Sequence, residues 1–347
     1  MVITGGSSGI GRCTAALFAR RGWRVGVIAR GSAGLASSRE ELEGLGARVA
    51  TAEADVADAL ALSAAADVIV RALGPVDVWI NGAGNGVYGR FEDVPAAEFQ
   101  RVTDVTYNGT VNGTRLALAH MRRRGRGSVV NVCSAIAFHG LPLMSSYAGA
   151  KAAVRGFTQA LQAELRREGS AIRVSTVFPP AANTPFFSHA PSHMGWPARP
   201  ARPVYAPEVV AEGIWQAARS GRREVTISGV AAAFSLATRL APWLIAWCMA
   251  QVGAERQSTR DADVLRLQEP TLFQPSETAL GAHGPFGDEA RGWSIQLWLH
   301  ALRIGLVRAF SRPWAGASRP GARSRPARAR PAADPALARL DERHDTA

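Results

Sequence analysis

Short apolar runs and amphipathic segments alternate along the first two-thirds of the chain. The strand-like runs, rich in β-branched residues, are 1–4, 25–28, 76–80, 128–132 and 172–178. Helical periodicity marks 12–21, 96–124 and 147–167. The strands are too apolar to face water, which is typical of parallel strands covered by helices on both faces. The pattern over about residues 2–227 therefore predicts an α/β fold: a Rossmann-like, doubly wound parallel sheet in three α/β/α layers.

The alternation stops near residue 230. Beyond it, 230–252 is an apolar stretch, 259–288 reads as an extended, loop-rich segment, and 293–310 reads as a second apolar helix. From Ser311 onward arginine, proline and alanine dominate. We predict one α/β domain over 1–229, a helical C-terminal extension over 230–310 and a disordered tail over 311–347.

The apolar stretch 230–252 raises the question of a membrane, because roughly 20 apolar residues can cross a bilayer. Arg239 and Pro242 fall in its middle. An arginine at the bilayer centre costs about 2.5–3.5 kcal/mol on insertion scales. The sequence thus favours a helix packed on the domain, or on a second subunit of a homo-oligomer. Peripheral membrane contact through the extension, aided by the basic tail, is the alternative.

Charge and cysteine content narrow the choice of partner and compartment. The formal net charge is +12, but a large share of the excess arginine follows Ala301, and no aromatic residues alternate with it to stack on bases. We therefore predict no nucleic-acid partner. Cys13, Cys133 and Cys248 form neither a metal-ligand spacing nor a disulfide framework, so we predict no metal and a reducing, cytoplasmic compartment.

No secretory signal opens the chain, which begins almost directly in the first strand-like run. We expect either that the native start lies several residues upstream or that the first strand is short.

A glycine-rich turn, TGGSSGIG at 4–11, lies between the first strand and the first helix. Glycines let the backbone approach a pyrophosphate, whose charge is then held by N–H groups at the helix N-terminus. A plain loop is the alternative, and the flanking strand and helix argue against it. This spacing resembles that of the short-chain dehydrogenase/reductase family. The cofactor-binding residues expected in this turn are Gly5, Ser7, Ser8, Gly9, Ile10 and Gly11.

Further segments follow that family's order, and the resemblance implies a role for each. The family's order counts a third strand between the runs 25–28 and 76–80, which makes 76–80, 128–132 and 172–178 the fourth, fifth and sixth. Asp55 and Val56 come after that third strand, where the family's Asp accepts a hydrogen bond from the adenine amino group. The fourth strand runs into Asn81, Gly82, Ala83 and Gly84. This run matches the family's Asn-Asn-Ala-Gly motif except at Gly82.

The sixth strand runs into PPAANTP at 179–185. This segment resembles the family's Pro-Gly-x-x-x-Thr loop, which folds over the nicotinamide. Pro179 and Thr184 hold the matching places, and Pro180 replaces the glycine.

The choice of dinucleotide depends on the end of the second strand. No Asp or Glu stands there to hold a free ribose 2′-hydroxyl, and Arg30 is placed to pair with a 2′-phosphate, with help from Arg12. We predict NADP in preference to NAD. The alternative is that Arg30 is one more solvated arginine in an arginine-rich chain.

Tyr147 and Lys151 open a predicted helix, four residues apart and hence on one face. A phenol with a pKa near 10 is a poor acid–base catalyst at neutral pH, and a nearby ammonium lowers that pKa. Lys151 is also the one lysine among forty basic residues. Ser134 ends the fifth strand thirteen residues before Tyr147, the separation found in the family. By resemblance these three are the catalytic residues: Tyr147 transfers the proton, Ser134 holds the substrate oxygen, and Lys151 tunes Tyr147 and reaches the nicotinamide ribose.

One position departs from the family. Its members usually carry an Asn in the helix after the fourth strand, which binds a water that links the lysine to solvent; here Thr106 takes that place. A hydroxyl has one donor where an amide has two, so the proton relay is expected to be modified. Asn108 lies two residues further along and should face elsewhere.

Apolar residues in the loops near this centre predict a hydrophobic carbonyl or alcohol as the small-molecule substrate, with lipid-like compounds included. These residues are Val87, Tyr88, Phe138, Leu141, Leu143, Phe186 and Phe187. His139 is interpreted as a pocket-lining or loop residue rather than as a catalyst, and 188–205 as the substrate lid. Two functions remain: an NADP(H)-dependent oxidoreductase whose catalytic domain is 1–229, or a dinucleotide-binding sensor that has lost most of its turnover.

Overall fold

The structure is a computed structural model that describes residues 1–254 and 257–310. Its centre is a sheet of seven parallel strands in the order β3-β2-β1-β4-β5-β6-β7. The strands are β1 (Val2–Thr4), β2 (Val25–Ala29), β3 (Val49–Glu53), β4 (Val78–Asn81), β5 (Arg126–Val132), β6 (Ala171–Phe178) and β7 (Glu224–Thr226). The strand order reverses beside β1, and in open α/β sheets the crevice at such a point is where ligands bind. The predicted Rossmann-like sheet is confirmed.

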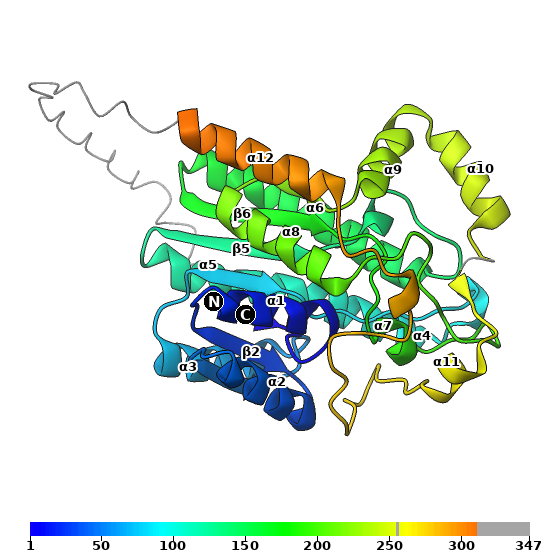
Figure 1. Cartoon of the computed structure of the whole chain (residues 1–347), viewed down its shortest axis with the longest axis horizontal. Coiled ribbons are helices and arrows are strands. Elements are labelled where there is room, and N and C mark those ends of the chain that lie inside the picture. The colour runs from blue at the N-terminus through cyan, green and yellow to red at the C-terminus, as the bar shows by residue number, and fades with distance from the viewer. Residues whose placement is uncertain (255–256, 311–347) are drawn as a thin grey trace, which may run out of the picture. The chain divides into compact units, whose positions relative to one another are not determined.

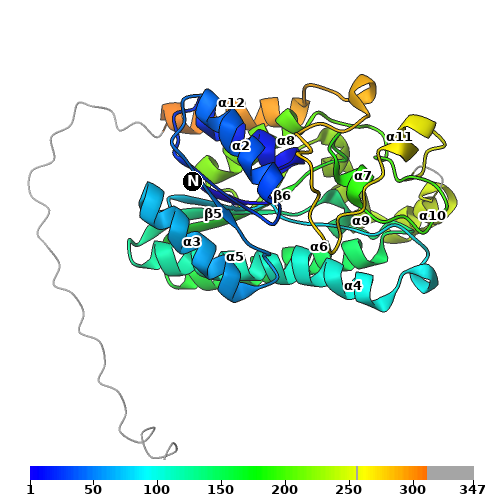
Figure 2. The same ribbon diagram turned by 90° about the horizontal axis from the view of Figure 1, so that it is seen from below.

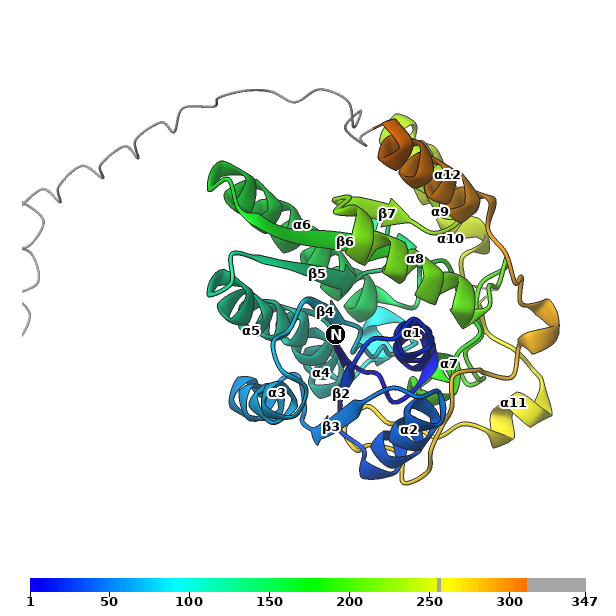
Figure 3. The ribbon, with the colours of Figure 1, turned by 60° about the vertical axis from the view of Figure 1, so that its left-hand side comes forward.

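Helices cover both faces of the sheet (Figure 3). One layer holds α1 (Gly9–Arg20), α2 (Ser32–Gly44) and α8 (Pro207–Ser220). The other holds α3 (Ala59–Leu73), α4 (Ala96–Thr103), α5 (Gly109–Arg122) and α6 (Ser145–Arg167), as Figure 2 shows from below. A separate apolar core fills each interface, with Phe18 of α1 against Trp215 of α8 in the first and Met121 of α5 in the second.

The predicted helix 96–124 is not continuous. A π-helical turn, Asp104–Asn108, separates α4 from α5. Such a turn adds a residue to the helical repeat and is common at functional sites. Here it places Thr106 inside the protein, with none of its surface exposed. Asn108 stays exposed and donates to Asp104, so it faces elsewhere as expected.

The predicted helical extension begins with two helices, α9 (Gly229–Leu240) and α10 (Pro242–Val252) (Figure 1). Pro242 lacks a backbone N–H and its ring clashes with the preceding turn, so a helix over 230–252 cannot run straight through it. The two helices meet at a bend of 119°. Within the described residues no single helix is long and apolar enough to span a membrane. Taken together, α9 and α10 have the length and apolar composition of a membrane span, but they are bent.

The rest of the extension returns along the α/β domain. It contains α11 (Ala262–Arg266), a 3₁₀ turn (Gly287–Glu289) and α12 (Ile295–Phe310), joined by the long irregular segment predicted from the sequence. α12 packs over α8, with Leu297 in the same core as Ile214. The predicted disordered tail, 311–347, lies outside the described residues.

Candidate active site

The predicted site residues meet around one cavity of about 570 Å³ at the carboxyl ends of the strands. All but one of the predicted catalytic and cofactor-binding residues line it: Gly5, Ser7, Ser8, Gly9, Ile10, Gly11, Arg30, Asp55, Val56, Ala83, Gly84, Ser134, Tyr147, Lys151, Pro179 and Thr184. The exception is Asn81, whose side chain turns into the sheet. It donates to Thr114 and Asn131 and accepts from the Trp79 indole at 2.8 Å. Asn81 therefore ties β4 to β5 and α5 rather than touching the cavity.

Ser134, Tyr147 and Lys151 come from two adjacent elements. Ser134 follows β5 and caps a 3₁₀ turn, Ala135–Ala137, by accepting from the Ile136 N–H. Tyr147 and Lys151 are one turn apart on α6, with the Lys151 Nζ 5.5 Å from the centre of the Tyr147 ring. Lys151 is buried and donates to the Val132 carbonyl at 2.8 Å. That bond fixes the ammonium beside the end of β5.

Burial dominates the acid–base properties of this centre. It raises the pKa of Tyr147 above its ordinary value near 10, and a hydrogen bond with the Ser134 side chain only partly opposes the rise. Burial also lowers the pKa of Lys151 to about 8. The spacing predicts that the ammonium lowers the pKa of Tyr147. The direction found is the opposite, because burial removes water from the phenol and thereby disfavours the phenolate. At neutral pH both side chains therefore carry their protons.

Thr106 is bonded to the loop that follows β4. Its Oγ1 donates to the Asn85 carbonyl at 3.0 Å and accepts from the Asn85 N–H at 3.1 Å. A Cβ added at Gly84 would lie 3.5 Å from the Lys151 Nζ and 3.6 Å from the Thr106 Oγ1, so the two groups border the same backbone. The hydroxyl proton of Thr106 is thus used in the hydrogen bond that holds this loop beside Lys151.

The glycine turn leaves space at the cavity that a side chain at these positions would occupy, and a dinucleotide needs that space. Gly5 and Gly9 have φ of +68° and +52°, which L side chains rarely adopt. A Cβ at Gly5 would lie 2.7 Å from the backbone of Ala83, and one at Gly11 would lie 2.0 Å from the Gly5 carbonyl oxygen. The turn therefore brings bare backbone and the N-terminus of α1 to the cavity, as a pyrophosphate requires.

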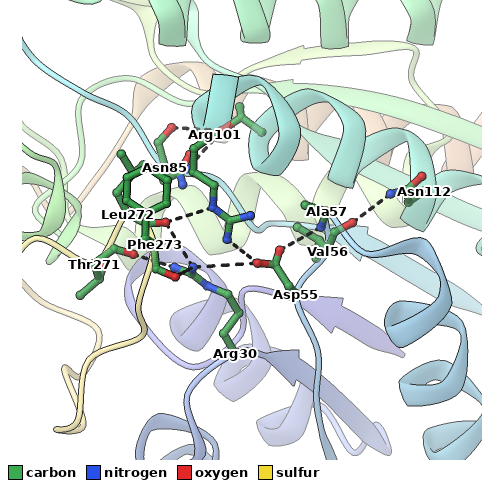
Figure 4. Close-up of polar contacts among 11 residues, drawn as sticks. Arg30, Asp55, Val56, Ala57, Asn85, Arg101, Asn112, Thr271, Leu272 and Phe273 are labelled. Carbon is green, nitrogen blue, oxygen red and sulfur yellow. Dashed lines mark hydrogen bonds and ion pairs between the residues drawn. The ribbon is translucent and has the colours of Figure 1, made fainter. Parts of the chain in front are cut away.

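The arginine at the end of β2 has partners that the sequence did not reveal (Figure 4). Its guanidinium donates to the carbonyls of Thr271 at 2.7 Å, Leu272 at 3.2 Å and Phe273 at 3.0 Å. Arg101 of α4 donates to the same Leu272 carbonyl and contacts the Asp55 carboxylate. Asp55 thus already has an arginine partner, which holds its pKa low against the effect of burial.

We call residues 271–281 the strap. Its far end reaches the glycine turn, where the Gly9 N–H donates to the Gly281 carbonyl at 3.0 Å. Pro275, Ser276, Thr278 and Leu280 line the cavity between the two ends. The strap therefore crosses the cofactor side of the cavity, a role that a loop of this composition did not signal.

Arg12, expected to assist Arg30, is placed elsewhere. It is buried under α2, with its Nε 2.6 Å from a Glu41 carboxylate oxygen and its Nη2 donating to Ser37. It does not line the cavity. The helical position directed its side chain toward α2, and the expectation that it reaches the cofactor is wrong.

The substrate side of the cavity is largely apolar and is shared by the domain and the extension. Its lining includes Tyr88, Leu141, Met144, Phe186, Phe187, Val230, Phe234 and Met249. The predicted lid, 188–205, contributes His189, Ala190, Arg199, Ala201, Arg202 and Pro203. Sequence reasoning missed the residues from α9 and α10, because an apolar stretch gives no sign of which side will face a ligand.

Four residues predicted for this side lie outside the lining. Phe138 stacks on Phe178 in the core, with ring centres 4.5 Å apart. Val87 is buried, and neither Leu143 nor His139 lines the cavity. Of the two positions predicted for His139, the pocket lining and a loop, the structure shows the loop.

One group of potential metal ligands occurs among the described residues: Cys13, Glu208 and His283, whose ligand atoms lie within 4.8 Å of one another. Glu208 is within 3.4 Å of the Cys13 thiol and 2.7 Å of the His283 ring nitrogen. These hydrogen bonds account for the cluster and join the segment after the strap to α1 and α8.

Known proteins resemble this arrangement. The model of the short chain dehydrogenase family matches residues 1–195. An uncharacterized oxidoreductase of Bacillus subtilis, YxnA, is 34% identical over 246 residues, covering 70% of this chain and 69% of that protein. A zebrafish (Danio rerio) 3-dehydrosphinganine reductase is 34% identical over 197 residues, covering 54% of this chain and 58% of that protein.

Solved structures share the fold. A Burkholderia phymatum short chain dehydrogenase/reductase in complex with NAD has a TM-score of 0.63 at 24% identity, covering 70% of this chain and 94% of that one. An alcohol dehydrogenase from Thermococcus sibiricus complexed with 5-hydroxy-NADP has a TM-score of 0.57 at 25% identity, covering 65% and 94%. With the family model matching more than half of its length and the Bacillus protein aligned over most of both sequences, the chain belongs to the short-chain dehydrogenase/reductase family of oxidoreductases.

Proposed function

We propose that the protein is an NADP(H)-dependent oxidoreductase that interconverts a carbonyl and a secondary alcohol on a hydrophobic substrate. The convergence of Ser134, Tyr147 and Lys151 beside the glycine turn supports this reaction above all. The nicotinamide, when bound, supplies or accepts the hydride. The remaining work falls to the protein's own side chains.

Each side chain has a task that follows from its surroundings. The Tyr147 hydroxyl holds a proton at neutral pH because burial raises its pKa, and that is the form needed to protonate a carbonyl oxygen during reduction. The Ser134 hydroxyl orients the same oxygen. Lys151, held by the Val132 carbonyl, keeps a positive charge next to Tyr147 and stabilises the phenolate left after proton transfer.

The preference for NADP rests on Arg30. No Asp or Glu stands at the end of β2 to hold a free ribose 2′-hydroxyl. The guanidinium is partly buried with Arg101 close by, and the one carboxylate beside it, that of Asp55, lies 4.0 Å away and is shared with Arg101, so a further anion would be stabilised there. The three strap carbonyls that accept hydrogen bonds from Arg30 are uncharged, so they are weaker acceptors than a phosphate. We propose that a 2′-phosphate replaces them, so that NADP(H) binding displaces this end of the strap.

The substrate class rests on the apolar lining and on one relative. The zebrafish relative is named as a reductase of 3-dehydrosphinganine. The cavity described above suits a substrate with an apolar chain. The three free cysteines favour a reducing compartment, which we take to be the cytoplasm, and the extension is proposed to contact membranes peripherally.

Loss of NADPH absorbance with a panel of aldehydes and ketones tests the proposal. We expect turnover that is faster with NADPH than with NADH and that falls by at least about 10²-fold in Tyr147→Phe. Tight NADPH binding without turnover on any substrate would instead favour a dinucleotide-binding sensor.

A further inference from the structure

The two helices that begin the extension expose large apolar side chains. Leu236 and Leu240 of α9 and Trp243, Leu244 and Trp247 of α10 are between 41% and 75% exposed. We call these five residues the α9–α10 patch. In Figure 1 the two helices stand out from the rest of the domain at their bend. Large apolar side chains exposed together on two consecutive helices are unusual on a protein surface and indicate a site of interaction.

The same helices are apolar on their inner side. Phe234 of α9 and Met249 of α10 line the cavity, together with Val230 at the start of α9. The helix pair is therefore a thin wall with the substrate cavity on one side and the patch on the other. A partner bound to the patch would lie next to the substrate side of the cavity.

Charge and residue type indicate which partner fits. Arg239 is the one charged residue in 229–252, and it is exposed. The sequence after Phe310 adds eight arginines against four acidic residues. Tryptophan side chains favour the boundary between lipid and water, and arginine favours anionic headgroups.

A second copy of the chain fits less well. A twofold interface would place the same patch on both sides, and α9 and α10 offer no acidic residue to pair with Arg239. A bilayer surface satisfies both the apolar side chains and the arginine.

We infer that the α9–α10 patch docks on an anionic membrane surface and that the substrate is an amphipathic lipid carbonyl or alcohol taken up from that surface. The docking part stands on the patch alone. The substrate part rests on the proposed function.

Flotation of the full-length protein with vesicles tests the docking. We expect binding to phosphatidylcholine vesicles that contain phosphatidylglycerol and weaker binding to pure phosphatidylcholine. The double variant Trp243→Ser/Trp247→Ser should lower binding by about tenfold or more, and Arg239→Gln by about fivefold. Leu60→Ser, which removes an exposed leucine on α3, is the matched control and should bind as the wild type does.

Two results would overturn the docking. One is equal flotation of the double variant, with circular dichroism showing that it is folded. The other is a wild type that ignores vesicles and instead forms dimers that the double variant cannot form, which would make the patch an interface between copies of this chain.

Kinetics separate the docking from the chemistry. Neither Trp243 nor Trp247 lines the cavity, so the double variant should reduce a short water-soluble ketone as the wild type does. Its rate with a long-chain ketone embedded in anionic vesicles should fall by about tenfold. Equal rates on the embedded ketone would refute uptake from the membrane, whereas absence of turnover on every substrate would refute the proposed function and leave flotation to decide the docking.

Discussion

The glycine turn and the strap form two walls of the same cavity by different means. At the turn, bare backbone approaches so closely that a single Cβ on Gly11 would collide with the Gly5 carbonyl. At the strap, the guanidinium of Arg30 holds carbonyls that lie more than 240 residues further along the chain. A side chain added to the glycine turn would displace backbone at the ends of the strands. The strap is held by hydrogen bonds that a stronger acceptor can replace, so the two walls should respond differently to mutation.

The largest effect should come from the reaction centre on the fixed side. Tyr147→Phe removes the proton donor while keeping the ring, and we expect turnover to fall by about 10²–10⁴-fold with NADPH binding retained. Tyr205→Phe, a buried tyrosine outside the cavity, is the matched control for steady-state rates. A Tyr147→Phe enzyme within a factor of two of wild type would remove Tyr147 from the mechanism.

Within the turn, Gly11→Ala should both destabilise the protein and weaken the cofactor. The added methyl meets backbone rather than a movable side chain, so we expect a loss of about 1–3 kcal/mol in unfolding free energy and at least about tenfold in NADPH affinity. Gly156→Ala on α6, where nothing lies within 4 Å, should be neutral or slightly stabilising. Denaturant titration and NADPH fluorescence measure the two quantities. A tolerated Gly11→Ala would mean that this wall is as adaptable as the strap.

On the strap side, Arg30→Gln should alter cofactor choice rather than folding. Losing a charge-assisted contact of about 1.5–3 kcal/mol should raise the KM for NADPH by about 10–100-fold and leave that for NADH nearly unchanged. Arg39→Gln, an exposed arginine of α2, should change neither. Limited proteolysis adds a second readout: NADPH, but not NADH, should increase cleavage within 271–281 of the wild type. Protection by NADPH would contradict displacement of the strap.

The smallest effect concerns the link between the extension and the lid. Glu289 pairs with Arg202 and Arg199, which lower its pKa to about 2. A carboxylate with a lowered folded pKa stabilises the fold above its unfolded value, and this contribution is lost as the pH falls toward the folded value. Because Arg202 is exposed and Glu289 and Arg199 are partly exposed, Glu289→Gln should lower Tm by only about 1–3 °C at neutral pH.

That difference should disappear as the pH falls from about 4.5 toward about 2. Thermal melts over this range measure it, with Glu168→Gln, which breaks the surface pair with Arg122, for comparison. A difference between wild type and Glu289→Gln that grows on acidification would contradict the assignment.

The sequence predicted what depends on local backbone and short spacings. The alternation of strands and helices, the glycine turn and the spacing of Ser134, Tyr147 and Lys151 each leave a signal within a few residues. The predictions that Asn81 and Arg12 face the cavity were wrong for a shared reason. Each residue lies at a suitable position in the sequence, but the direction of its side chain depends on a neighbour distant in sequence, Thr114 for Asn81 and Glu41 for Arg12.

The strap could not be predicted because its carbonyls carry no sequence information. Any residues at 271–273 would present the same acceptors to Arg30. The lowered pKa expected for Tyr147 failed for a related reason, since the spacing to Lys151 says nothing about how much water the fold removes from the phenol.

The single buried lysine has a chemical consequence. An ammonium whose pKa is near 8 releases its proton more readily than an ordinary surface lysine, so a larger share of Lys151 is a free amine at mildly alkaline pH. No other side chain of this protein carries a primary amine. Amine-directed reagents therefore have Lys151 and the chain's amino terminus as their targets, and the accessibility of the cavity controls the first. Acylation followed by mass spectrometry would read the state of the active site directly from a whole protein, without digestion or a substrate.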